Sequence, residues 1–379
     1  MVRATVAQLV LLAFPRGVNA RRCEAKEVFQ ATKKNQWHFD MGTCTSVYFD
    51  HHKQGGLTEE AMPALVEALK AARKLEHFEV RGSDMWAGGT AMLGAYLRTS
   101  AVLKNMSLTD VHMRYMGARA ISEALKANPN SSMQLLHVWD KSIGEAGAVE
   151  LASIGMKSTY LERLYLSWTS FLPLAMTDDR FSCQEEKAGA TACASWANQG
   201  QCLLNPDFMR RECTIACGFC RNYHNTTVTP GTAAATLAEV LKVNSVLTEL
   251  RIVSNTIGNE GLSAIAKALE SNTALTSLHI LDVSIGDEGA MAMAQVLKTN
   301  TVLTELKLSG NSIGDEGAAA LAEALKTNRV LKALDLRANK IGKAGGALLR
   351  NAHDSSTANG VSTLSELHLA HNPLEKDEL

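Results

Sequence analysis

The chain has 379 residues, of which 46% are hydrophobic and 20% are charged, and its formal net charge is −1. This length allows an extensive core and more than one structural module. The near-zero charge argues against a protein that binds nucleic acid through nonspecific electrostatic attraction.

The first residues have the pattern of a secretory signal peptide. Arg3 precedes an apolar run at 4–14, Pro15 ends that run, and small residues at 18–20 offer a cleavage site. The run is too short to cross a bilayer as a helix, and no other apolar run is long enough. We therefore expect residues 1–20 to be removed and the mature chain to have no membrane span. The alternative is an apolar N-terminal helix within the folded protein.

Residues 21–56 are expected to form an N-terminal cap. Their only cysteines are Cys23 and Cys44, so the simplest prediction is a disulfide between them. The alternative is a metal or redox site, although the histidines available for it lack a recognised ligand spacing: His38, His51 and His52. The sequence then predicts a helix at 57–73.

A 28-residue unit fills most of the remaining chain. Its pattern is L-x-x-L-x-[LI]-x-x-N-x-I-G, followed by a helical run of alanine and leucine. Weaker copies start at Leu75, Leu103, Met133 and Leu161. Clear copies lie within 247–346 and start at Leu247, Leu275, Leu303 and Leu331. A fixed period in this range indicates a solenoid of stacked repeats.

The copy that starts at Leu303 indicates why the units must stack. Its strand leucines, at 303–308, point to one side, and Asn311 follows where its amide can bond turn groups that would otherwise be buried unpaired. Its helix has leucines on one face at 321–325. One unit cannot bury these apolar faces alone, so neighbouring units must cover them.

These units resemble the ribonuclease-inhibitor class of leucine-rich repeat. The resemblance implies an α/β solenoid, in which parallel strands alternate with helices, over residues 57–172 and 230–374. One clear copy departs from the pattern, because Val283 stands where the others have asparagine. A final strand at 364–369 is expected to close the solenoid, followed by a tail at 375–379.

The repeat that starts at Leu161 is interrupted. Its strand is followed by Phe171, and then the pattern stops until a helical run appears at 231–243. We therefore predict an insertion at 173–229, between the strand and the helix of one repeat. Its core, 183–220, holds six closely spaced cysteines: Cys183, Cys193, Cys202, Cys213, Cys217 and Cys220. This density predicts disulfides and an oxidising compartment, with fifteen pairings open from the sequence.

The insert resembles the ShKT family, a small three-disulfide fold first seen in sea-anemone toxins. The supporting residues, besides the cysteine spacing, are Trp196-Ala197, Gly200, Asn205-Pro206, Met209 and Gly218-Phe219. The family's pattern implies the pairs Cys183–Cys220, Cys193–Cys213 and Cys202–Cys217. Toxin members block potassium channels with a Lys-Tyr pair, but Asp207 and Phe208 stand at those positions here. A secreted ligand or a channel-modulating, toxin-like module is an alternative function, although the lysine that the toxins use is missing here.

Cys217 and Cys220 also form a C-x-x-C pair, which raises a second alternative. A thiol-disulfide oxidoreductase, or a cofactor of one, would use such a pair in its reduced form. Catalysis requires a strand before the motif and a helix N-terminus beneath it, and neither is visible in the sequence. Structural cross-links remain the simpler prediction.

The chain ends in Lys376, Asp377, Glu378 and Leu379, the KDEL retrieval signal. Together with a signal peptide, this end predicts residence in the endoplasmic reticulum lumen and the KDEL receptor as a partner. N-glycosylation sequons occur at Asn105, Asn130 and Asn225. Asn130 and Asn225 are expected in exposed loops, whereas Asn105 falls at a strand position.

Motifs for catalysis or for cofactor or metal binding are missing from the sequence. It contains no phosphate-binding glycine loop, no G-x-S-x-G and no H-E-x-x-H. The G-D-E-G segments at 286–289 and 314–317 lack the spaced ligands of a calcium loop and suit helix starts instead. We therefore predict a non-enzymatic scaffold, without cofactor, that binds proteins through its concave face, its insert or both.

An aromatic patch is the best candidate for the binding site. Outward-facing strand positions elsewhere are small or charged, for example Arg251, His279, Lys307 and Asp335. Two neighbouring repeats instead place these residues on that face: His137, Trp139, Tyr165 and Trp168. Exposed tryptophan and tyrosine are common anchors of protein interfaces. The alternative is that the patch merely seats the insert.

Overall fold

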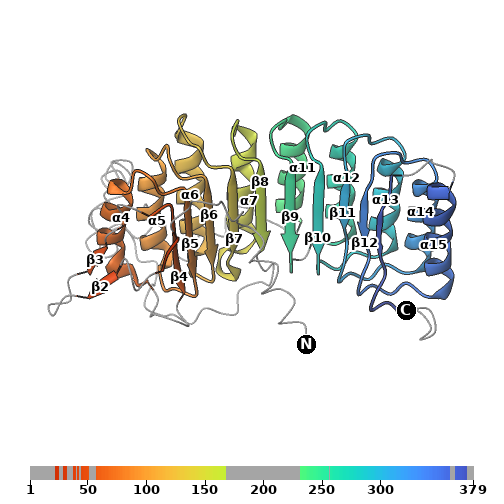
Figure 1. Cartoon of the computed structure of the whole chain (residues 1–379), viewed down its shortest axis with the longest axis horizontal. Helices are drawn as coiled ribbons and strands as arrows, with labels where there is room; N and C mark the ends of the chain where they lie inside the picture. Colours follow the sequence, from red (N-terminus) through yellow and green to blue (C-terminus); the bar gives the residue numbers. More distant parts are fainter. Residues whose placement is uncertain are drawn as a thin grey trace, which may run out of the picture.

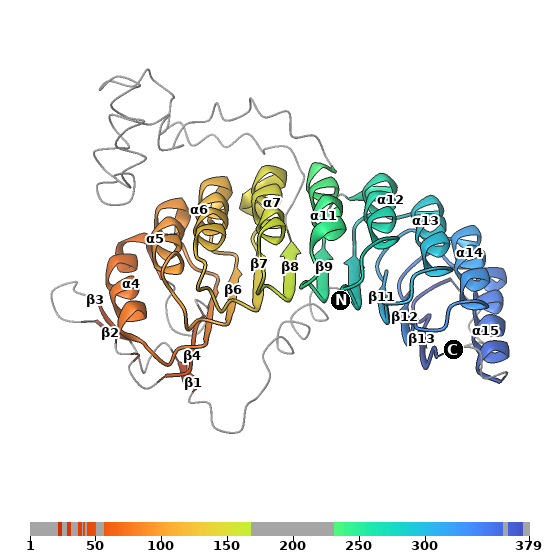
Figure 2. The same ribbon diagram turned by 90° about the horizontal axis from the view of Figure 1, so that it is seen from above.

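The computed structural model describes residues 22–24, 29–31, 37–39, 41, 44–50, 57–167, 231–255, 257–358 and 363–373. The predicted signal peptide, the predicted insert with its six cysteines, Trp168, Asn225 and residues 376–379 lie outside these residues. The described chain forms an arc of stacked strand–helix units (Figures 1 and 2).

The strands form one parallel sheet that lines the inner side of the arc (Figure 2). In order across the sheet they are β1 (Arg22–Glu24), β4 (Ser46–Asp50), β5 (His77–Arg81), β6 (Asn105–Thr109), β7 (Leu135–Trp139), β8 (Arg163–Ser167), β9 (Glu249–Val253), β10 (Ser277–Leu281), β11 (Glu305–Lys307), β12 (Ala333–Asp335) and β13 (Glu366–His368). A separate antiparallel pair joins β2 (Phe29–Ala31) and β3 (Trp37–Phe39) near the N-terminus.

The helices cover the outer side of the sheet, one after each strand from β4 to β12 (Figure 2). They are α4 (Met62–Ala71), α5 (Trp86–Leu97), α6 (Arg114–Ala127), α7 (Gly144–Ala152), α11 (Thr232–Val243), α12 (Gly258–Leu269), α13 (Asp287–Leu297), α14 (Asp315–Leu325) and α15 (Lys343–Ala358). Short 3₁₀ turns are η1 (Glu59–Ala61), η2 (Lys141–Ile143) and η3 (Ser153–Met156). Within the described residues, no helix has the length and apolarity needed to cross a membrane. The predicted fold class is confirmed.

One continuous core runs between the sheet and the helices. Leu306 and Leu308 from the strand side meet Leu321 from the helix side, and each of the three side chains is fully buried. Equivalent residues of every described repeat join the same cluster. Each helix therefore depends on its neighbours as well as on its own strand.

The sheet continues without a gap across the insertion. β8 pairs directly with β9 in parallel register, with Leu164 opposite Leu250. α11 supplies the helix missing after β8, and its Ala233 N–H donates to Glu145 Oε1 on α7 at 2.7 Å. The repeat is therefore complete when its strand and its helix are joined through the insert.

A disulfide fastens the N-terminal strand of the sheet. Cys23 in β1 and Cys44 before β4 are joined, with 5.9 Å between their Cα atoms, and both residues are buried. β1 pairs with β4 in parallel. The predicted disulfide is present, and it ties the edge strand to the first full repeat.

Asparagine side chains carry hydrogen bonds from one repeat to the next in the turns after the strands. Asn311 Nδ2 donates to the carbonyl of Ile280 in the preceding repeat at 2.9 Å. Its Oδ1 accepts from the backbone N–H groups of Val283 and Ile285, both at 3.1 Å. Asn339 repeats the link toward Leu308 at 2.9 Å. The asparagines therefore satisfy buried backbone groups of the neighbouring repeat as well as those of their own turn.

Two repeats that lack this asparagine have a different turn. Val111 and Val283 stand at the asparagine position, and the next residues, His112 and Ser284, have φ values of 55° and 62°. Both valines are fully buried. Repeats with the asparagine have one left-handed residue in this turn, directly before it, whereas the two valine repeats have a second one directly after.

The first turn of each C-terminal helix is capped by the repeat before it. Asp287 Oδ1 accepts from the N–H groups of Gly314 and Gly317, at 2.7 and 2.8 Å. Asn259 and Asp315 form the same pair of bonds with the helices that follow them. A Cβ atom at Gly317 would lie 2.7 Å from Asp287 Oδ1, so this approach requires glycine. The G-D-E-G segments are therefore inter-repeat caps.

Replacing Asp287 tests this capping. Asp287→Ala leaves two helix-start N–H groups without their acceptor, so the free energy of unfolding should fall by about 1–2 kcal/mol. Asp287→Asn retains an oxygen acceptor, as Asn259 does, and should lose well under about 1 kcal/mol. Urea unfolding followed by circular dichroism measures both effects.

Glu316→Ala is the matched control, because Glu316 is an exposed acid in the first turn of α14, the helix that Asp287 caps. It removes a favourable charge at the helix start without removing the cap, so its cost should be about 0.5 kcal/mol or less. Equal losses in Asp287→Ala and Glu316→Ala would contradict the capping role.

Candidate functional site

The concave face is formed by the strand side chains that point away from the helices. Strand register places one central row along it, with His137 opposite Tyr165, Tyr165 opposite Arg251, and Arg251 opposite His279. The row continues through Lys307, Asp335 and His368. Side chains that are far apart in the sequence therefore become close neighbours, as alternation along the strands predicts.

The predicted aromatic patch lies on this face but is less exposed than expected. His137 and Tyr165 are only 8% and 7% exposed. Their rings pack edge to face with centroids 5.9 Å apart, and the Arg251 guanidinium lies over the Tyr165 ring at 4.5 Å. Trp139 is half-buried at the end of β7. The expectation of exposure was wrong for His137 and Tyr165, because their neighbours cover them.

Burial also sets the charge state of the patch. Desolvation, helped by the positive charges of Arg251 and Arg81, lowers the pKa of His137 to about 4. Its Nδ1 lies 2.9 Å from Ser107 Oγ. Burial likewise raises the pKa of Tyr165 above its usual value. Both rings are therefore neutral at pH 7.

A charged network occupies the concave face beyond β8. Arg251 pairs with Glu249 in β9. Glu305 Oε2 lies 3.2 Å from His279 Nε2, and Glu305 Oε1 also pairs with Lys307. The hydrogen bond with His279 is the main reason that the pKa of Glu305 lies far below its usual range.

This network superficially resembles a catalytic triad, but its geometry does not activate a nucleophile. Ser277 Oγ donates to Glu305 Oε2 at 2.7 Å, and Ser277 Oγ and Glu305 both approach the same ring nitrogen of His279. In a triad, the base and its orienting acid use opposite ring nitrogens. His279 is also only 1% exposed, and burial lowers its pKa. The group is suited to holding strands in register.

The charges divide the concave face into a neutral centre and two charged flanks. The concave positions of β6 and β7 carry no full charge at pH 7: Asn105, Ser107, Thr109, Leu135, His137 and Trp139. On one side lie Glu79 and Arg81 of β5. On the other lie Arg163 of β8, which donates to Asn105 Oδ1 at 3.4 Å, and the Arg251–Glu249 pair of β9. Glu249 and Glu305 were not singled out from the sequence, although the 28-residue period places them beside the predicted row of Arg251, His279, Lys307 and Asp335.

Two of the predicted glycosylation sites are described, and they differ. Asn105 is 3% exposed, and its Nδ2 lies 2.8 Å from His77 Nδ1. A glycan on this nitrogen would break the contact in the folded chain; glycosylation at Asn105 stays a prediction. Asn130 is exposed in the turn after α6.

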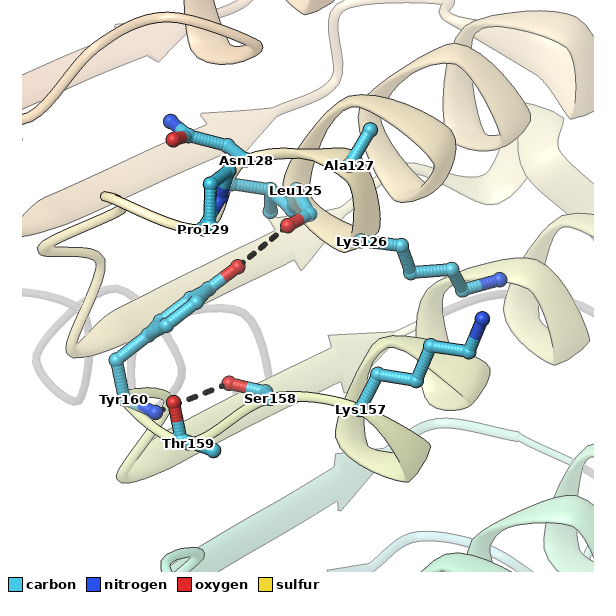
Figure 3. Close-up of a pocket in the computed structure, with 9 residues that line it drawn as sticks. All are labelled: Leu125, Lys126, Ala127, Asn128, Pro129, Lys157, Ser158, Thr159 and Tyr160. Atoms are coloured by element: carbon cyan, nitrogen blue, oxygen red, sulfur yellow. Dashed lines mark hydrogen bonds between the residues drawn. The ribbon is translucent and has the colours of Figure 1, made fainter.

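A pocket near the end of α6 is lined by Leu125, Asn128, Pro129 and Tyr160, among others (Figure 3). It lies between the end of α6 and the segment before β8, where Tyr160 Oη donates to the Leu125 carbonyl at 2.6 Å. Lys126 and Lys157 extend along one side of it (Figure 3). These groups lack an acid–base pair. The described residues also contain no cluster of three histidine, cysteine, aspartate or glutamate side chains that could hold a metal.

Comparison with known proteins supports the two-part architecture. The family described as Leucine Rich repeat matches residues 243–266, 271–294, 299–322 and 327–349. The family described as ShK domain-like matches residues 182–220. The chain is thus a leucine-rich-repeat solenoid that carries a ShK-like insert. A comparison with curated proteins finds no match.

Two solved structures are similar to parts of this chain. One is titled "Leiomodin-1 Actin-Binding Site 2 (ABS2)"; it is 23% identical, covers 36% of this chain and 81% of that chain, and gives a TM-score of 0.29. The other is an internalin (inlF) from Listeria monocytogenes str. 4b F2365, 14% identical, covering 82% of this chain and 66% of that chain, with a TM-score of 0.36. At these identities and scores, neither likeness bears on function.

The buried His137 predicts a pH effect on stability. Its folded pKa of about 4 lies below the ordinary value of 6.5. As the pH falls from 6.5 to 4, the unfolded chain therefore takes up a proton that the folded chain refuses, and stability is lost. His137→Gln should remove about 3 kcal/mol of this loss. Parallel stability curves for the two proteins, measured by urea unfolding from pH 7 to 4, would contradict the buried neutral state.

Proposed function

We propose that this protein is a non-enzymatic scaffold that binds protein partners through the concave face of its solenoid. The observation that carries the proposal is the arrangement of this face, with uncharged side chains on β6 and β7 beside Tyr165, and charged side chains on both flanks, including Arg163 of β8. Protein interfaces have the same anatomy, because charges are depleted at their centre and enriched at their rim. Trp139 is the anchor within the neutral centre.

We place the scaffold in the endoplasmic reticulum lumen. The apolar N-terminal segment and the KDEL sequence support this proposal. The Cys23–Cys44 disulfide also fits an oxidising compartment. Within this proposal, Asn130 carries a glycan on the edge of the solenoid where helices end and strands begin.

The ShK-like insert suggests the second candidate function. Cys217 and Cys220 lie at its end, and a reduced pair there would make the protein a thiol-disulfide oxidoreductase. The match to the ShK-like family favours disulfides, since its cysteine pattern includes both residues. Insulin reduction by the purified protein separates the two functions.

Trp139→Ala tests the concave binding site. Partners are first identified by affinity capture from the lumen with mass spectrometry, and the recovered partner is then titrated against purified variants. Trp139→Ala should weaken binding by about 1–2 kcal/mol and leave the melting temperature nearly unchanged. Met291→Ala, at an exposed residue on the outer helix α13, is the control and should bind normally.

The contrary outcome is equally specific. If Trp139→Ala binds normally but melts at a lower temperature, or exposes the insert to proteolysis, the aromatic centre seats the insert and the binding proposal is wrong.

Removing Lys376–Leu379 tests the location. The shortened protein should appear in the culture medium, because the retrieval receptor no longer recognises it. The intact protein should remain in the cell with glycans of the early secretory type. Retention of the shortened protein to the same extent would refute the retrieval proposal.

A further inference from the structure

Two repeats place bulky side chains where their neighbours have glycine in a left-handed conformation. Eleven residues after the start of the unit, the repeats of β7 and β9 have Gly144 and Gly258, both with a φ of 62°. The repeats of β5 and β6 have Trp86 and Arg114 there, with φ values of 52° and 56°. Side chains strain this conformation, at a cost on the order of 1 kcal/mol or more for each residue.

The strained residues bring four side chains together in what we term the Trp86 cluster: Asp84, Trp86, His112 and Arg114. The rings of His112 and Trp86 stack with centroids 5.3 Å apart. The guanidinium carbon of Arg114 lies 4.8 Å from the centre of the Trp86 ring. His112 Nδ1 lies 3.1 Å from Asp84 Oδ1, so the carboxylate of the cluster is already engaged.

This cluster is open to solvent. Trp86 is 38% exposed, and it is the only aromatic residue among the large exposed hydrophobic side chains of the described chain. The side chains of His112 and Asp84 are 49% and 59% exposed. The strained backbone at Trp86 and Arg114 therefore positions side chains at the surface and does not serve the packing of the core.

Arg114 contributes a positive charge that the described residues do not neutralise. Three other arginines have carboxylate partners: Arg119 with Glu123, Arg251 with Glu249, and Arg337 with Asp335. The guanidinium of Arg114 instead lies over Trp86, and its Nε is buried without a hydrogen-bond acceptor. Trp86 and Arg114 are also the first residues of α5 and α6, where helix dipoles add positive potential.

We propose that the Trp86 cluster is a second docking site, which binds an acidic peptide segment of a partner protein. A carboxylate of the segment bonds the Arg114 guanidinium, and an adjacent apolar side chain packs on the solvent-exposed part of Trp86. Tryptophan and arginine are the commonest anchors of protein interfaces, and a charged hydrogen bond beside an aromatic ring gives direction as well as affinity. The site lies at the edge where strands lead into helices, separate from the concave centre.

The test uses mature protein and a fluorescein-labelled octapeptide of alternating glutamate and phenylalanine. Fluorescence anisotropy should show saturable binding that weakens as salt is added. Trp86→Gly and Arg114→Gly should each weaken binding at least about tenfold. Both variants should keep the wild-type melting temperature, because glycine is the residue found at this position in neighbouring repeats.

Three controls isolate the site. Arg98→Ala removes an exposed arginine at the opposite end of α5, and Trp139→Ala alters the concave face; both should bind the peptide normally. Peptides with lysine in place of glutamate should not bind. Arg114→Glu should reverse this preference, which keeps the test valid if a glycine variant is unstable.

Several results would overturn the proposal. These are the absence of saturable binding at low salt, equal binding of the lysine peptide, or unchanged binding by both folded glycine variants. Full competition by inorganic phosphate, with no contribution from phenylalanine when it is replaced by alanine in the peptide, would mean a simple anion site.

Discussion

The structure depends on hydrogen bonds that pass from one repeat to the next. A single strand–turn–helix unit leaves buried turn amides and helix-start N–H groups that it cannot satisfy itself. Asn311 and Asp287 satisfy such groups in the preceding and the following repeat, respectively. Stacking is therefore required by polar groups as well as by the apolar core. These bonds lie in the turns, so the strand side chains on the concave face are not needed to satisfy the turn and helix-start groups.

The same arrangement explains how the chain accommodates an insertion. The segment outside the described residues enters after β8 and returns at α11, yet β8 and β9 pair in normal register. Asn244 Nδ2 still donates to the Gly155 carbonyl across the junction, at 2.8 Å. Strand pairing and side-chain links hold the two halves of the interrupted repeat, and the entropic cost of a long connection between them grows only slowly with its length.

The solenoid could be predicted from the sequence, because leucine spacing reports which side chains are buried; the bounds of the insertion stay a prediction. The sequence did not predict the exposure of His137 and Tyr165, which depends on the length of neighbouring side chains such as Arg251. From the sequence, Asp287 was interpreted as an acid that favours the start of its own helix, α13, whereas its side chain caps the next helix, α14. The sequence did not single out Trp86 and Arg114. A large residue at the glycine position of a repeat reads as an ordinary departure from the pattern, and only the φ angle shows that the backbone there is left-handed.

We have proposed that partners occupy the concave face of this solenoid in the endoplasmic reticulum lumen. Oxidative footprinting tests it directly, by comparing side-chain oxidation in intact microsomes with oxidation of the purified protein. Trp139 should be protected in microsomes, whereas Met291, which is 41% exposed on the outer helices, should react equally in both. Equal oxidation of Trp139 in the two preparations, or protection confined to Met291, would contradict the account.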